Sequence, residues 1–110
     1  MGSLADRVRA AREQWVSVEG HEFLIRRPTR LQLSKLAGVV TSDAVIGCVV
    51  GWKTPENKLV PGGGGEVPPF DPEAFREWVE DDIDILVGLT KNLKDLIERY
   101  SRDKEAAEKN

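Results

Sequence analysis

The chain has 110 residues, of which 40% are hydrophobic and 32% are charged, and its formal net charge is −3. This length fits a single domain, 1–110, with enough core to fold without disulfides or metal. The acidic balance argues against nucleic acid as a partner, and no apolar run reaches the ~20 residues of a membrane span. With one cysteine and one histidine, the chain can form neither an internal disulfide nor an ordinary structural zinc site.

Charge is unevenly distributed along the sequence. Residues 1–35 contain seven Arg or Lys against four Asp or Glu, whereas residues 66–98 contain three against ten. This polarity is compatible with two solvated surfaces, and also with a molecule whose basic face meets the acidic face of a neighbour. For the second alternative we expect self-association, with Arg26, Arg27 and Arg30 as basic partner-binding residues.

The first quarter of the chain predicts a helix followed by a β-hairpin. Ser3 can cap a helix over 3–13, because Asp6 completes a capping box. Residues 15–26 are rich in strand-forming side chains on both sides of Gly20, which predicts two strands joined by a type II′ turn at 20–21. An isolated two-stranded ribbon is marginally stable, so we expect helices to cover its apolar face.

Residues 29–52 are predicted to form two helices. Thr29 and Gln32 make a second capping box, and Gly38 is a suitable end for the helix that it begins. Residues 44–52, AVIGCVVGW, are the longest uncharged apolar run, and we expect them to be helical and to lie at the centre of the core. Their valine content leaves a strand as the alternative.

Residues 53–69 are predicted to be one long loop without regular structure. Prolines lie near both ends, and residues 62–65 are four consecutive glycines. Loops of this length inside a small domain are usually functional or disordered, and we expect 57–68 to be poorly ordered.

Two more helices are predicted over 71–107. Asp71 can cap the first of them, with Pro72 at its first position and Phe70 stapled onto Phe75. The second helix carries a seam of apolar residues at alternate spacings of three and four. We expect Leu86 and Leu89 to pack in the core, whereas the C-terminal part of the seam either packs there too or binds a helical partner. The seam consists of Leu86, Leu89, Leu93, Leu96 and Tyr100, and the partner-binding candidates are Leu93, Leu96 and Tyr100.

These elements together predict an α+β fold, mostly α-helical, with about five helices, one N-terminal β-hairpin and a long Gly/Pro-rich loop. Trp15, Trp52 and Trp78 are expected to be core anchors. His21 is expected to be exposed in its turn, and Cys48 to be a buried small hydrophobe.

No catalytic pattern is found in the sequence. Residues 47–54 depart from a phosphate-binding loop, because the glycine spacing is short by one residue and Trp52 separates Gly51 from Lys53. One histidine in a surface turn supports no nucleophile–base pair. We therefore predict that the protein is not an enzyme and uses no cofactor or metal.

Several short segments occur in a defined order along residues 15–105. They are FLIRRPT at 23–29 after the hairpin, CVVGW at 48–52, the Gly/Pro-rich loop, and FDPEAFREW at 70–78 before a charged helix. In this combination the chain resembles the tail assembly chaperones of long-tailed bacteriophages. The resemblance implies binding to the tape measure protein, assistance to tail tube subunits, no catalytic residues, and a location in the cytoplasm of the infected bacterial host.

The same resemblance implies two product lengths, because members of that family are often extended by a programmed ribosomal frameshift near the end of the gene. The final tripeptide, 108–110 (EKN), can be encoded by GAA-AAA-AAC, which permits such a slip. The competing expectation is a small non-enzymatic regulatory adaptor, of phage or bacterial origin, that binds one host protein and stays monomeric.

Overall fold

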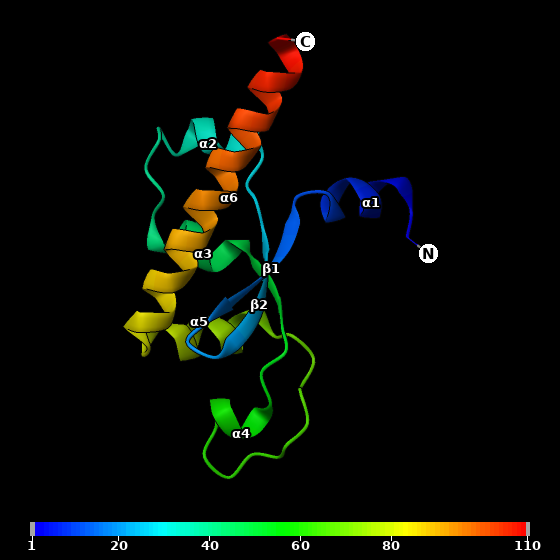
Figure 1. Ribbon diagram of the computed structural model, residues 1–110. Helices are drawn as coiled ribbons and strands as arrows, with labels where there is room; N and C mark the ends of the chain where they lie inside the picture. The colour runs from blue at the N-terminus through cyan, green and yellow to red at the C-terminus, as the bar shows by residue number, and fades with distance from the viewer. Residues whose placement is uncertain (1, 110) are drawn as a thin grey trace.

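The computed structural model describes residues 2–109 and combines helices with one antiparallel sheet (Figure 1). This confirms the α+β class and its mostly helical content. Residue 110, and with it the end of the tripeptide 108–110, lies outside the described residues. In chain order the elements are α1 (Leu4–Ala10), β1 (Glu13–Val18), β2 (His21–Arg26), α2 (Arg30–Lys35), α3 (Ser42–Cys48), β3 (Val49–Trp52), α4 (Glu56–Leu59), α5 (Pro72–Glu80) and α6 (Ile83–Lys109).

The predicted helix starts are confirmed at three places. The hydroxyl of Ser3 accepts from the backbone N–H of Asp6, whose carboxylate accepts from the N–H of Ser3. Thr29 and Gln32 form the same reciprocal pair at α2. Asp71 caps α5, with proline at the first turn. These caps accept hydrogen bonds from backbone N–H groups that the first turn of a helix leaves unpaired. In each cap the bonded residues lie only a few positions apart in the sequence.

The hairpin pairs Val18 with His21, so its central turn residues are Glu19 and Gly20 rather than the predicted 20–21. Their φ angles are +51° and +81°. Two positive φ values are the pattern of a type I′ turn, not of the predicted type II′ turn. Strand β1 also begins at Glu13, because residues there pair with Arg26, so α1 ends earlier than predicted.

The central apolar run is half helix and half strand, so the prediction of helix throughout 44–52 was wrong. Helix α3 ends at Cys48, and the next four residues form β3, which pairs antiparallel with β2 in the order β1-β2-β3. The sheet therefore has three strands, not the two of a lone hairpin. Pairing with β3 occupies the free edge of β2 and buries both Val49 and Trp52 in the core.

The predicted loop 53–69 contains a short helix, α4, which is why the helix count exceeds the expected five. Backbone N–H groups of Glu56 and Asn57 donate to the carbonyls of Glu66 and Gly64, each at 2.9 Å. A Cβ at Gly63 would lie 2.8–2.9 Å from atoms of Glu56, so only glycine permits this close approach. These bonds join the two sides of the span, and the poor order of 57–68 stays a prediction.

The core lies between the sheet and helices α3, α5 and α6 (Figure 1). Helix α6 crosses the sheet so closely that the side chain of Val18 fills the space a Cβ of Gly88 would need. Among residues 2–109, no helix combines the length and apolarity of a membrane span. The buried apolar residues are Val16, Val18, Phe23, Ile25, Val45, Ile46, Val49, Trp52, Phe75, Val79, Ile85, Leu89 and Leu93.

The three tryptophans differ in burial. Trp52 is 7% exposed and belongs to the core, as predicted. Trp78 is half-buried and packs against the core from its edge. Trp15 is 41% exposed, so its prediction as a core anchor was wrong. Its indole instead lies under the ammonium of Lys53, 4.4 Å from the ring centroid.

Candidate functional site

The predicted partner-binding seam on α6 faces mostly inward. Leu93 is 1% exposed and is surrounded by the core, so it is not available to a partner in the folded domain. Leu96 packs against the same core and is half-buried. Tyr100 is half-buried as well, with the guanidinium of Arg27 stacked 3.6 Å from its ring centroid.

The three predicted basic residues do not act as one exposed cluster. Arg26 donates two hydrogen bonds, of 2.9 and 2.6 Å, to one carboxylate oxygen of Glu13. Arg27 is 8% exposed and donates to the carbonyl of Pro28 at 2.9 Å. Burial lowers the pKa of Arg27, while Tyr100 acts in the opposite direction. Only Arg30, at the start of α2, is exposed.

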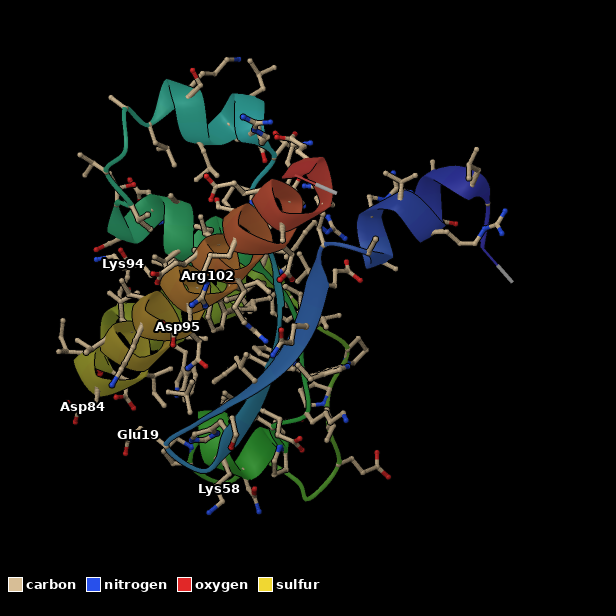
Figure 2. All side chains as sticks on the ribbon, turned by 45° about the horizontal axis from the view of Figure 1, so that its top comes forward. Glu19, Lys58, Asp84, Lys94, Asp95 and Arg102 are labelled. Atoms are coloured by element: carbon tan, nitrogen blue, oxygen red, sulfur yellow. The ribbon has the colours of Figure 1, made fainter. Side chains whose placement is uncertain are left out.

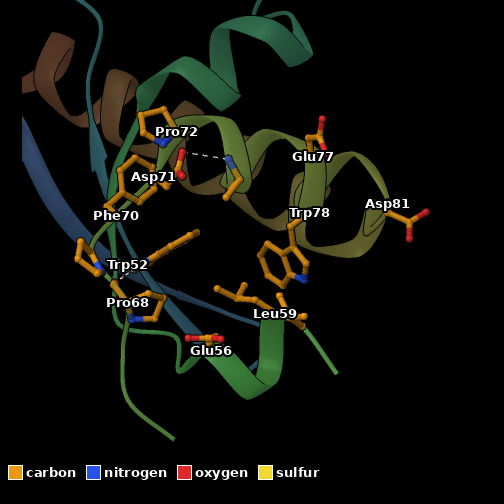
Figure 3. A pocket seen from close by; sticks show the side chains of 13 residues that line it. Trp52, Glu56, Leu59, Pro68, Phe70, Asp71, Pro72, Glu77, Trp78 and Asp81 are labelled. Atoms are coloured by element: carbon orange, nitrogen blue, oxygen red, sulfur yellow. Dashed lines mark hydrogen bonds between the residues drawn. The ribbon is translucent and has the colours of Figure 1, made fainter. Parts of the chain in front are cut away.

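A large hollow lies between α4 and α5, and we call it the aromatic groove (Figure 3). Its volume is about 920 Å³, at the upper end of the ~300–1,000 Å³ typical of ligand sites. Apolar side chains from β3, α4, α5 and the segment before α5 form its walls. The lining residues are Trp52, Glu56, Leu59, Val60, Pro68, Pro69, Phe70, Asp71, Pro72, Ala74, Glu77, Trp78 and Asp81.

Local contacts hold the groove walls in place. The indole N–H of Trp52 donates to the carbonyl of Pro68 at 2.8 Å, which joins the end of β3 to the segment before α5. Phe70 meets Trp52 edge-on, with 5.0 Å between ring centroids, and lies 5.9 Å from Phe75. The predicted staple between Phe70 and Phe75 is therefore present and forms part of the groove wall.

Residues that line the aromatic groove carry exposed carboxylates. Glu77 and Asp81 lie on its α5 side and Glu56 on its α4 side, and all three are exposed (Figure 3). The thirteen lining residues, all within the described chain, include no Lys or Arg. Arg76, the basic residue of α5, is bound to Asp43 at 2.8 Å. A hollow with apolar walls and a negative rim favours a ligand that is both apolar and cationic.

A second, smaller apolar hollow lies between α2 and α6, beside the C-terminal part of the predicted seam. Its volume is about 470 Å³, and Leu33, Leu36, Val39 and Ile97 are among its lining residues. It carries both a lysine and a glutamate, Lys94 and Glu98, so it lacks the one-sided charge of the aromatic groove.

His21, which contacts the groove residue Trp78, was expected from the sequence to be exposed. It is half-buried, its Nδ1 is hydrogen-bonded to Oγ1 of Thr54 at 3.2 Å, and its ring meets Trp78 edge-on at 5.3 Å. The correct turn register would have found it, because His21, Phe23 and Ile25 then alternate toward the core. Burial lowers the pKa of His21, with opposing contributions from Asp82, which raises it, and Lys58, which lowers it.

This pKa shift predicts that part of the stability depends on pH. The ordinary histidine pKa is about 6.5, so the unfolded chain binds the proton at a higher pH than the folded chain does. The contribution of His21 is therefore complete above about pH 7 and is lost as the pH falls through 6.5 toward the folded-state pKa. We expect the urea midpoint of the wild type to fall between about pH 7.5 and pH 5.5, and that of His21→Gln to fall less. Equal falls would contradict this assignment.

Comparisons of the chain with known protein families, with curated proteins and with solved structures find no match. Within residues 2–109, no group of three or more His, Cys, Asp or Glu side chains is placed to hold a metal ion. The aromatic groove itself offers rings for apolar side chains and carboxylates for cationic ones.

Proposed function

We propose that this protein is a non-enzymatic tail assembly chaperone of a long-tailed bacteriophage. In this role it binds the tape measure protein and assists tail tube subunits to assemble around it, in the cytoplasm of the infected host. The ordered segments between residues 15 and 105 support the family, and the aromatic groove is the observation that supports a binding role.

The groove suits one class of client, an amphipathic helix with basic residues beside its apolar stripe. Helices bind grooves by inserting side chains spaced three or four residues apart. Phe70 and Trp78, both half-buried in the groove wall, provide aromatic surface for such side chains, and aromatic residues are enriched at binding hot spots. Glu77 and Asp81 then face the basic residues of the client. Tape measure segments of this pattern are the clients we expect.

The binding test uses the full chain and overlapping segments of the tape measure protein encoded beside it. We expect at least one basic amphipathic segment to bind, and the affinity to fall at high salt. The double variant Glu77→Lys, Asp81→Lys should bind it about three- to tenfold more weakly, as expected for two exposed charge pairs. The matched control is Asp103→Lys, Glu105→Lys, which makes the same charge change on α6 outside the groove.

Two results would count against the proposal. If no tape measure segment binds, the client is another protein, and a basic host protein bound in the same groove would support the regulatory adaptor instead. If the control variant weakens binding as much as the groove variant does, only net charge is being sensed and the groove is not the site. The position of the gene, between a tail tube gene and a long tape measure gene, is an independent check.

A further inference from the structure

Helix α1 stands clear of the rest of the molecule (Figures 1 and 2). None of its residues is buried, and its apolar residues Leu4 and Val8 are 69% and 59% exposed. They are four positions apart and so share one face of the helix. An isolated helix of fewer than about 12 residues is marginal in water, even with a capping box. This helix therefore lacks the apolar contact that would stabilise it.

We propose that α1 of one copy docks in the aromatic groove of a second copy of this chain. Leu4 and Val8 supply the apolar stripe, and the groove supplies the rings that would cover it. Arg7 lies on the same short helix, whose Arg9 is paired with Asp6, and the groove rim is acidic. Both the apolar and the charged parts of the two surfaces are thus complementary.

The fold places α1 and the groove at opposite ends of the β1–β2 ribbon. Trp78, in the groove wall, contacts His21 beside the hairpin turn, whereas α1 joins β1 at Glu13. The six residues of β1 span roughly 20 Å. Only two residues, Ala11 and Arg12, connect α1 to this strand, and they reach at most about 7 Å.

The connection is also held in place. The N–H of Ala11 donates to the carbonyl of Arg7 at 3.0 Å, and the side chain of Arg12 donates to the carbonyl of Arg27 at 3.1 Å. Helix α1 therefore lies at the far end of the ribbon from the groove of its own chain, and the contact forms between copies.

A contact between two different surfaces is head-to-tail, so it propagates into open chains or closes into a ring. The proposed contact joins the basic N-terminal region of one copy to the acidic 66–98 region of the next. It does not use Arg26 or Arg27, which form hydrogen bonds inside the domain. The inference does not require the proposed function. If that function holds as well, the client and α1 of the next copy compete for one groove.

Sedimentation at about 50 mM salt and at increasing protein concentration tests the proposal, without any client present. The wild type should associate, and the association should weaken in about 1 M salt, where the Debye length is ~3 Å. Leu4→Asp with Val8→Asp should raise the dissociation constant at least tenfold. The matched control is Leu31→Asp with Val39→Asp, two apolar residues 67% and 61% exposed outside the groove, and it should associate like the wild type.

Mixing variants identifies the two surfaces. The Leu4→Asp, Val8→Asp chain retains the groove, and the Glu77→Lys, Asp81→Lys chain retains α1. Each should associate more weakly alone than the wild type does, but together they should form a one-to-one dimer that does not grow. A monomeric wild type would overturn the proposal. So would an α1 variant that associates as strongly as the wild type, a control that does not associate, or a mixture without heterodimer. Because no client is used, these failures leave the tape measure result unaffected.

Discussion

Replacement of Trp52 by alanine is expected to lower the free energy of unfolding by about 3–5 kcal/mol. The side chain is 7% exposed and lies edge-on to Phe70 and Phe75, at centroid distances of 5.0 and 6.4 Å. Alanine would leave a cavity at the junction of β3, α5 and the groove wall, and would remove the hydrogen bond to Pro68. A domain of ordinary stability, ~5–15 kcal/mol, would then be close to unfolding.

Urea denaturation of two companion variants separates the causes. Trp52→Phe keeps an aromatic ring but loses the indole N–H, and should cost only ~1–2 kcal/mol. Trp15→Ala removes the same side chain from a site that is 41% exposed, and should cost less than half as much as Trp52→Ala. An unchanged midpoint for Trp52→Ala would show that this indole is not part of the core.

Gly88→Ala is expected to destabilise the domain by about 1–3 kcal/mol, although alanine is the better helix former. The added Cβ would occupy space that the side chain of Val18 already fills, where α6 crosses β1. Neither partner can move easily, because Val18 is 6% exposed and its strand is paired with β2. The clash therefore outweighs the gain of up to ~1 kcal/mol in helix propensity.

The matched control is Gly47→Ala in α3, where a Cβ would meet nothing within 4 Å. There the same substitution should stabilise the protein by up to ~1 kcal/mol. The double variant Gly88→Ala, Val18→Ala should lose less than the sum of its two single effects, because the second change makes room for the first. If the loss of the double variant equals the sum of the two single losses, α6 and β1 do not touch at this point.

The candidate site was only partly accessible to sequence reasoning. The cap at Asp71 and the contact of Phe70 with Phe75 were predicted, and both form one wall of the aromatic groove. The groove as a whole was not predicted, because its opposite wall comes from α4, in a span expected to lack regular structure. Of the predicted surface, Leu93 is in the core, and Leu96 and Tyr100 are half-buried.

The sequence by itself determined the features that depend on neighbouring residues. These are the capping boxes, whose groups lie within a few positions of each other, and the α+β class, which follows from the local patterns of helix- and strand-forming residues. Tertiary structure decided the rest. Residues 49–52 are a strand because the edge of β2 is there to pair with them, and Arg26 and Arg27 are engaged because Glu13 and Tyr100 are brought to them from other elements. A side chain's partners and burial depend on segments far away in the chain, which local patterns do not specify.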